Sequence, residues 1–361
     1  MKFRTRIAAV LGVLALLPVG SVPANEPYDL ASFYWISDGP KNAVAPQLAA
    51  AAGQPSCGEQ CNSGCGGQCD SGSPARRRAP RWTAQADLMY MQRCGAPDVT
   101  LISLVGPPPT QELTNAKDFN LGWHGGPRLS LSTYGDRGND LEVVYFSIDG
   151  WWDSQAQNVP TGVQFTAPDF QALAFGASGM KFDWTSKLYN AEVNLWVPQT
   201  DRLRVMAGFR WIETRESLIG TFVSPGGVTP FWSTKTDNHL YGFQIGADTR
   251  LLDRGGPFYV TTAIKAGIYR NYTQQVGSAV GTVLEAEETR TAFESDVTLA
   301  GVYEVSRCLS VRLGYQFMWL DGVAVAPSQI HVTNVSTRVA SVDTDGAVFY
   351  HGAVAGLELK F

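Results

Sequence analysis

Residues 309–319 read Leu-Ser-Val-Arg-Leu-Gly-Tyr-Gln-Phe-Met-Trp, with a large apolar side chain at every second position. The positions between them are mostly small or polar, as at Arg312 and Gln316. Successive side chains of a β-strand point to opposite faces of the sheet. The stretch therefore predicts a strand with one apolar face and one polar or small face.

The same period of two recurs through residues 82–361 and predicts about ten strands of roughly 10–17 residues each. Its alternating stretches are 84–90, 121–131, 141–152, 189–197, 203–211, 241–251, 258–268, 293–305, 309–319 and 353–361. The pattern breaks within 141–152, which predicts a bulge, and Pro127 predicts another bulge or kink. Soluble strands usually have about five or six residues, so these lengths favour tilted membrane crossings.

Short and long connections alternate along the chain. We expect turns near 135–140, 198–201, 253–256 and 306–308, and long loops near 92–118, 153–180, 218–235, 274–288 and 322–346. This alternation is typical of outer-membrane barrels, which have tight periplasmic turns and long external loops. The fold class predicted is all-β, a transmembrane antiparallel up-and-down β-barrel of about ten strands, or twelve. A soluble sandwich is the alternative, but it gives no reason for sorting loops by length.

The N-terminus carries the features of a secretory signal peptide. A basic stretch precedes eleven apolar residues (7–17), and the small residues Val22 and Ala24 suit a cleavage site. An apolar stretch this short is a poor transmembrane anchor. We therefore expect residues 1–24 to be a signal peptide, and the protein to be exported.

Residues 25–81 resemble a periplasmic tether rich in Ala, Pro, Gly and Cys, with too little apolar sequence to bury a core. Its four cysteines are Cys57, Cys61, Cys65 and Cys69. Closely spaced cysteines of exported proteins usually form disulfides, here local or to another envelope molecule. A four-thiolate metal site is the alternative, but zinc sites more often have two separated Cys pairs. We expect no metal and no cofactor, and we expect Cys94 and Cys308 not to pair with each other.

Composition excludes several classes of function. The 361 residues carry 28 basic and 33 acidic side chains, for a net charge of −5. Only 17% of residues are charged and 11% are aromatic, which is too apolar for a disordered chain. The negative charge also argues against a nucleic-acid partner.

The chain ends in Ala353-Val-Ala-Gly-Leu-Glu-Leu-Lys-Phe361. Leu357, Leu359 and the terminal Phe361 stand at every second place and resemble the bacterial barrel-assembly signal. This ending implies the barrel-assembly machinery and outer-membrane lipid as partners. A closed barrel needs a defined last strand because lipid cannot satisfy an open sheet edge.

The layout of 82–361 resembles a family of outer-membrane β-barrel porins with a Cys/Gly/Pro-rich N-terminal lead. The quoted motifs are Trp82-Thr-Ala-Gln-Ala-Asp-Leu-Met-Tyr90 and Gly125-Gly-Pro-Arg-Leu129. The resemblance implies location in the outer membrane and a porin-like character. It brings no catalytic residues.

The polar faces of the predicted strands would line the lumen, with eight acids and eight bases. The acids are Asp87, Glu142, Glu192, Asp248, Glu294, Asp296, Glu304 and Glu358; the bases are Arg128, Arg202, Arg204, Arg210, Arg250, Lys265, Arg312 and Lys360. Arg128, Arg202, Arg204, Arg210, Asp248, Arg250, Lys265, Glu294, Asp296 and Arg312 are the pore-lining candidates. Balanced charge in a narrow bore favours interior ion pairs over a selective ring. The other interpretation is that Arg202, Arg204 and Arg210 line a path for anions.

The predicted function is a porin-like outer-membrane barrel with a narrow or partly plugged pore for small solutes. One alternative is a structural or adhesive envelope protein with a disulfide-linked tether, whose segments 218–232 and 329–342 extend above the membrane. A barrel hydrolase using Asp237 and His239 is less favoured, because no nucleophile motif is present; we expect no enzyme. An interfacial aromatic girdle is expected from Tyr90, Trp123, Trp151, Trp184, Trp211 and Trp319.

Overall fold

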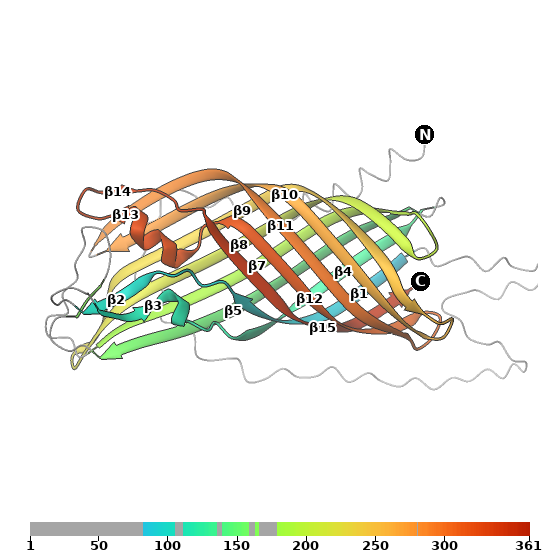
Figure 1. Cartoon of the computed structure of the whole chain (residues 1–361), viewed down its shortest axis with the longest axis horizontal. Helices are drawn as coiled ribbons and strands as arrows, with labels where there is room; N and C mark the ends of the chain where they lie inside the picture. Colours follow the sequence, from blue (N-terminus) through green and yellow to red (C-terminus); the bar gives the residue numbers. More distant parts are fainter. Residues whose placement is uncertain (1–81, 105–110, 136–138, 159–162, 166–178, 280) are drawn as a thin grey trace, which may run out of the picture. The chain divides into compact units, whose positions relative to one another are not determined.

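The computed structural model describes residues 82–104, 111–135, 139–158, 163–165, 179–279 and 281–361. Within them, ten antiparallel strands close into a barrel in the order β1-β15-β12-β11-β10-β9-β8-β7-β5-β4 (Figure 1). The prediction of a ten-stranded antiparallel barrel is confirmed. The barrel strands are β1 (Trp82–Cys94), β4 (Trp123–Tyr134), β5 (Asp140–Asn158), β7 (Gly179–Pro198), β8 (Leu203–Ser224), β9 (Gly227–Asp253), β10 (Phe258–Ala279), β11 (Thr282–Glu304), β12 (Leu309–Val323) and β15 (Gly346–Lys360).

The barrel closes where the first strand meets the last. β1 and β15 pair over twelve positions, from Thr83 opposite Lys360 to Cys94 opposite Phe349. The terminal Phe361 also exchanges two backbone hydrogen bonds of 2.9 Å with Trp82. The C-terminal alternating stretch is therefore the strand that removes both sheet edges.

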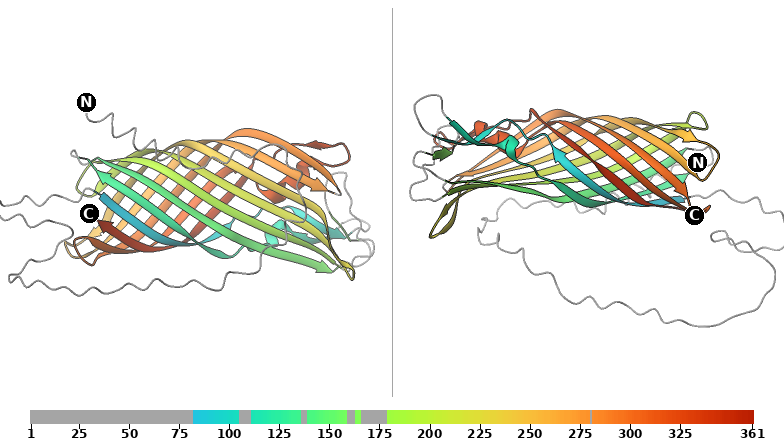
Figure 2. Two further views of the ribbon diagram at one scale, coloured as in Figure 1. Left: turned by 180° about the vertical axis from the view of Figure 1, so that it is seen from behind. Right: turned by 60° about the horizontal axis from the view of Figure 1, so that its bottom comes forward.

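One end of the barrel carries short connections, and we call it the turn end. Its connections are 135–139, 199–202, 254–257 and 305–308, and both β1 and β15 have their outer termini there. The opposite end, the loop end, carries the connections from β1 to β4, β5 to β7, β8 to β9, β10 to β11 and β12 to β15. Figure 2 shows that the two ends lie far apart along the strands.

Two of the expected long loops are wrong. Most of segments 218–235 and 274–288 is strand, because β8 runs to Ser224, β9 starts at Gly227, β10 runs to Ala279 and β11 starts at Thr282. The pairing continues because backbone hydrogen bonds do not require the apolar alternation used to find strands. Segment 218–232 thus forms the hairpin that was expected. Segment 329–342 instead contains the end of 3-10 helix η3 (Ala326–Val332) and a short hairpin.

The irregularities of the sheet match the sequence only in part. The register of β5 against β7 shifts between Ile148 and Trp151, as the broken pattern predicted. Pro127 causes no register shift against β1, so the second expected bulge is wrong. Pairing of β4 with β5 begins at Arg128, and the N–H that Pro127 lacks is therefore not required by that ladder.

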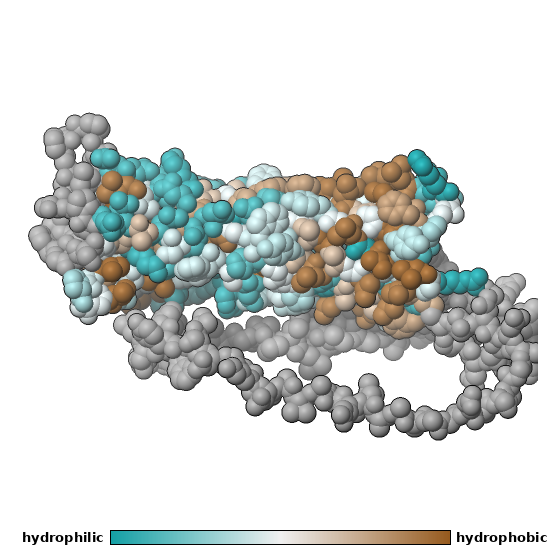
Figure 3. All heavy atoms as spheres, turned by 90° about the horizontal axis from the view of Figure 1, so that it is seen from below, coloured by the Kyte–Doolittle hydropathy of each residue, from teal (hydrophilic) through white to brown (hydrophobic). Residues whose placement is uncertain are grey.

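The outside of the barrel carries an apolar belt near the turn end (Figure 3). Phe243, Ile245 and Leu313 are 77%, 69% and 66% exposed. On each of several strands the belt runs for nine to eleven residues, as in 203–211, 241–251, 258–268, 293–303, 309–319 and 349–359. A tilted strand needs about 9–11 residues to cross the hydrocarbon core of a bilayer. These lengths and exposures suit contact with lipid.

Aromatic residues border this belt on its loop-end side. Tyr90 stacks on Trp123 with ring centroids 5.6 Å apart, and Trp211, Tyr241 and Trp319 lie on the outward faces of β8, β9 and β12. This arrangement is an interfacial girdle. The assignment of Trp151 and Trp184 to the girdle is wrong, because both indoles are fully buried inside the barrel.

Smaller elements lie at the loop end. The β1–β4 connection holds β2 (Thr100–Leu104), β3 (Gln111–Asn115) and 3-10 helix η2 (Ala116–Asp118), and β6 (Val163–Phe165) pairs with β2. The β12–β15 connection holds η3 (Ala326–Val332), β13 (Thr333–Asn334) and β14 (Val339–Ala340). None of the helices in the described ranges is long and apolar enough to cross a membrane.

Gly352 tests the closure of the barrel. A Cβ at this position would lie 2.1 Å from the carbonyl oxygen of Tyr90 on β1. We expect Gly352→Leu to lower the free energy of unfolding by about 1–3 kcal/mol through overpacking. The measurement is the fraction of heat-modifiable, folded barrel on a gel across a urea series.

Ala355→Leu is the matched control, because Ala355 is on the same strand but exposed on the lipid-facing side. It should fold as the wild type does. Equal stability of the two variants would contradict the close pairing of β1 with β15 at the point where the barrel closes.

Candidate functional site

The turn-end half of the lumen is filled by a buried network that we call the ionic layer. It consists of Glu192 on β7, Arg210 on β8, Gln244 on β9, Lys265 and Tyr269 on β10, and Glu294 and Asp296 on β11. All of these side chains come from the barrel wall, at inward positions of the period-two pattern. They meet because a ten-stranded barrel is narrow enough for inward side chains to reach across it.

Arg210 is the centre of the ionic layer. Its Nη1 lies 2.8 Å from Glu294 Oε1 and 2.8 Å from Asp296 Oδ2. Its Nε donates to Asn190 Oδ1 at 2.5 Å and lies 3.6 Å from Glu192 Oε1. The Arg210 side chain has no exposed surface. A buried guanidinium needs such partners, because an unpaired buried charge is very costly.

Lys265 completes the layer from the opposite side. Its Nζ donates to Glu192 Oε2 at 2.7 Å, and Gln244 Nε2 donates to the same oxygen at 2.9 Å. Tyr269 donates to Glu294 Oε2 at 3.3 Å. Two cations thus face three carboxylates, all paired across the lumen.

The remaining pore-lining candidates do not join this network. Arg204 bridges Asp140 at 3.1 Å and Asp248 at 2.8 Å near the turn end. Two further arginines link other parts of the wall: Arg128 donates to Gln316 at 3.3 Å, and Arg312 donates to Gln85 at 2.7 Å. Arg202 and Arg250 are exposed at the turn end, with Arg250 3.3 Å from Asp253. These last two lie at the turn end because Arg202 is in the connection before β8 and Arg250 is close to the end of β9.

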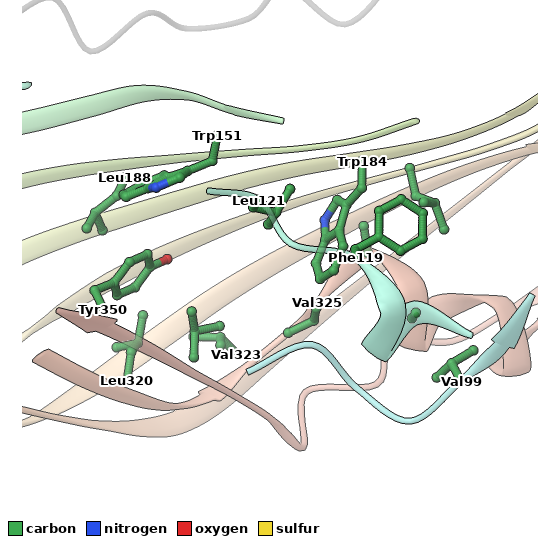
Figure 4. Close-up of a cluster of buried hydrophobic side chains, with 14 of the residues drawn as sticks. Val99, Phe119, Leu121, Trp151, Trp184, Leu188, Leu320, Val323, Val325 and Tyr350 are labelled. Atoms are coloured by element: carbon green, nitrogen blue, oxygen red, sulfur yellow. The ribbon is translucent and has the colours of Figure 1, made fainter. Parts of the chain in front are cut away.

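The loop-end half of the lumen is filled by apolar side chains. Two connections enter it, residues 95–104 with 111–122 and residues 324–345, which we call the plug. Figure 4 shows Leu121 and Val325 of the plug in one buried cluster with Val323, Trp184 and Tyr350 of the wall. The cluster is buried throughout: its larger members include Met89, Leu101, Phe119, Leu121, Trp151, Trp184, Leu188, Leu320, Ile330 and Tyr350.

Glu216 on β8 fastens the plug to the wall. Its Oε2 accepts a 3.0 Å hydrogen bond from the backbone N–H of Ala326, the first residue of η3, and one of 3.3 Å from Trp184 Nε1. Its Oε1 accepts from Arg93 Nη2 at 2.5 Å and from Ser186 Oγ at 3.2 Å. The Arg93 guanidinium also lies 4.5 Å from the centre of the Trp184 ring. One carboxylate therefore ties three wall strands to the plug.

Asn238 on β9 binds the plug at Ala324, two residues before Ala326. Its side chain bonds both backbone groups of Ala324, accepting from N–H at 2.8 Å and donating to C=O at 2.9 Å. Asn271 on β10 donates to the carbonyl of Gly322 at 3.0 Å, and Gln275 donates to Thr333 Oγ1 at 2.5 Å. The contacts that Asn238 and Gln275 make with the plug are neutral, unlike those of the ionic layer.

The first plug segment is folded by its own polar contacts. Asn115 Oδ1 caps η2 by accepting from the N–H of Lys117 at 3.0 Å, and it also accepts from the N–H of Val99 at 3.1 Å. Asp98 accepts from Asn115 Nδ2 at 2.6 Å and from Lys117 Nζ at 3.2 Å. The hydrogen bond from Asn115, followed by that from Lys117, holds the pKa of Asp98 below its ordinary value.

Several other sequence-based expectations have a defined place. Cys94 is a free thiol and Cys308 is disulfide-bonded, so the two do not pair with each other, as predicted. His239 lies 3.4 Å from Glu213 on the outward side, and Asp237 lies 3.6 Å from Arg215. The predicted signal peptide 1–24 and tether 25–81, including Cys57, Cys61, Cys65 and Cys69, lie outside the described residues.

Sequence reasoning missed Glu216, Asn238 and Arg93 as functional residues. Glu216 and Asn238 lie outside the expected strands 203–211 and 241–251, and Arg93 lies in the expected loop 92–118, so no inward or outward side was assigned to them. The period of two that begins at Leu203 places Glu216 inward once β8 is extended. The alternation therefore places Glu216 inward, but only the observed length of β8 shows that the strand reaches it.

No family model and no curated protein sequence matches the chain. Solved structures are similar in fold. Neisserial surface protein A (NspA) is 11% identical, with 78% of this chain and 97% of that chain covered and a TM-score of 0.31. The outer membrane protease OmpT from Escherichia coli is 9% identical, with 78% and 97% covered and a TM-score of 0.43. The Ralstonia pickettii toluene transporter TbuX is 11% identical, with 78% and 90% covered and a TM-score of 0.32. Likeness this distant concerns the fold and not the chemistry.

Arg210 tests the ionic layer. We expect Arg210→Met to lower the free energy of unfolding by about 3–5 kcal/mol, because it leaves buried carboxylates without their cation. Adding Glu294→Gln should recover part of this loss by removing one of the stranded charges. The measurement is urea unfolding of the refolded barrel in detergent micelles.

Arg202→Met is the control, since Arg202 is exposed at the turn end. It should change stability by no more than about 0.5 kcal/mol. A loss as small as this in Arg210→Met would show that the layer does not support the barrel.

Proposed function

We propose that this protein is an outer-membrane barrel that contains a narrow, porin-like pathway for small solutes and keeps it closed at rest. The apolar belt and its aromatic girdle support a membrane position. The signal-peptide features and the terminal Phe361 support export and insertion into the outer membrane by the barrel-assembly machinery. In this orientation the turn end faces the periplasm and the loop end faces outward.

The observation that carries the proposal is that the ionic layer and the plug are attached to the barrel wall in different ways. The ionic layer consists of wall side chains that pair with one another, so it stays in the lumen when the loops move. The plug enters from the loop end and is held by Glu216 and by single amide contacts such as those of Asn238. Withdrawal of the plug would open the loop-end half of the lumen and expose the ionic layer, whose charged side chains offer hydrated solutes a polar surface.

Weakening the plug contacts should open the pathway. We expect the double variant Glu216→Gln with Asn238→Ala to raise the open probability by at least about tenfold, because hydrogen bonds to a charged group contribute about 1.5–3 kcal/mol and 1.4 kcal/mol corresponds to a factor of ten. The wild type should be closed for most of a recording. The measurement is single-channel conductance of the refolded mature chain in planar lipid bilayers.

Ser224→Ala is the matched control. Ser224 donates to Gly227 at the tip of the β8–β9 hairpin and touches neither the ionic layer nor the plug. It should behave as the wild type does. If the double variant inserts and folds but stays as closed as the wild type, the pathway does not exist.

A structural or adhesive role in the envelope is the second candidate, and the long hairpins favour it. β8 continues for thirteen residues beyond Trp211, to Ser224, and β9 returns over a similar length. At about 3.3 Å per residue these strands reach roughly 40 Å along their length past the girdle. Both strands stay paired with β7 and β10 in the wall, and the outward face of this extension can present a surface to a partner.

Non-reducing gels of isolated envelopes test this second role. If the cysteine-rich tether links the barrel to neighbours, we expect a ladder of cross-linked species that collapses on reduction. Replacement of Cys57, Cys61, Cys65 and Cys69 by Ser should abolish the ladder. A single monomer band without reductant would exclude covalent linkage to other envelope proteins.

A further inference from the structure

Three polar side chains meet on the lipid-facing side of the barrel where it closes. Cys94 is the last residue of β1, His351 lies on β15 and Tyr315 lies on β12. Cys94 Sγ is 3.6 Å from His351 Nε2, and the Tyr315 hydroxyl is 2.6 Å from His351 Nδ1. The imidazole thus stands between a thiol and a phenol. This is the order of nucleophile, base and orienting group that acyl-transfer sites share.

The contact between Tyr315 and His351 bears on whether the imidazole can act as a base. A phenol oxygen can accept a hydrogen bond from Nδ1–H. In that tautomer Nε2 carries a lone pair directed at Cys94, so it can accept the thiol proton. Tyr315 would then fix the ring in the orientation that a base requires.

The cluster lies within the aromatic girdle. Trp123 meets His351 edge-on with ring centroids 5.4 Å apart, and Phe349 lies 5.6 Å from it. His351 pairs across strands with Gln92 on one side and Phe317 on the other. Aromatic girdles lie at the level of lipid headgroups, and the ester bonds of membrane lipids lie just beneath them. The thiol is therefore at the height of those esters.

A cavity of about 280 Å³ begins at the residues that follow Cys94. Its wall includes Gly95, Ala96, Pro97, Gly346 and Ala347, together with Val325, Ser328, Asp343 and Asp345. Gly95 follows the thiol with φ of +91°, and a Cβ there would lie 2.9 Å from the carbonyl oxygen of Ala347. The residue after Cys94 must therefore be glycine, which keeps the seam open beside the thiol.

We propose that Cys94, His351 and Tyr315 form a thiol site that takes an acyl chain from a membrane lipid ester. His351 Nε2 accepts the thiol proton as Sγ attacks the ester carbonyl carbon. The bond from that carbon to the lipid oxygen breaks, and the lipid leaves as an alcohol with the proton, so Cys94 carries a thioester. Water then attacks the thioester, which releases the fatty acid and restores the thiol. Oxidation states are unchanged throughout.

The sequence predicted no enzyme because nothing in its spacing connects these residues. Cys94 and His351 are 257 positions apart, and only closure of the barrel brings them together. The six cysteines of the chain are an even number, so only the structure shows that Cys94 is a free thiol. The inference rests on the membrane position of the barrel, but not on the proposed pathway.

The experiment incubates the refolded mature chain, kept reduced, with vesicles of diacyl phosphatidylglycerol or with vesicles containing lipid A. Intact-mass spectrometry reads an acyl adduct on Cys94, and extraction reads released fatty acid. We expect adduct, released acid or both from one of the two vesicle types, which identifies the lipid class. Cys94→Ala should abolish both signals, and His351→Gln should lower the rate about 100-fold. Tyr315→Phe, which keeps the ring, should lower it less.

His239→Gln is the matched control, because His239 is also outward and near the girdle but faces Glu213 instead of a thiol. It should react as the wild type does. Gel heat-modifiability confirms that each variant is folded, and bilayer conductance tests the pathway separately. Absence of both adduct and fatty acid with folded wild type, or activity that survives Cys94→Ala, would overturn the proposal.

Discussion

Closure of the sheet is the constraint on which the rest of this structure depends. A strand edge in hydrocarbon would leave its backbone N–H and C=O groups without partners, so β1 and β15 must pair along their whole common length. Closing only ten strands then fixes a narrow lumen. Inward side chains from opposite walls come within contact distance, and the interior is filled.

The ionic layer and the plug both fill the lumen, but they do so with different chemistry. Around Arg210 the wall places charges that satisfy one another, and such a set is stable only while every member remains. Toward the loop end the wall turns apolar, and two connections supply the matching apolar surface. Glu216 and Asn238 join these connections to the wall through a few polar contacts. The ionic layer is therefore permanent, whereas the plug has discrete attachments that can be released.

The closing seam also shapes the outer surface. Because β1 and β15 end side by side, Cys94 and His351 meet on the lipid side, and the chain diverges beyond Gly95 to leave a cavity. The proposed pathway through the lumen and the proposed thiol chemistry at the girdle would therefore use different faces of the same strands.

The sequence by itself predicted about ten strands, the side on which each belt residue lies, and the closing role of the C-terminal stretch ending at Phe361. Period two is a local property, so it can be read without knowing any partner. Only the tertiary structure decided which inward charges meet, as Arg210 and Glu294 do, since this depends on register and on the width of the barrel. It also decided that Trp151 turns inward, because the bulge after Ile148 changes the phase of the alternation. Only the tertiary structure decided that residues 95–104 and 324–345 fold inward, because the closed barrel supplies the apolar space that they fill.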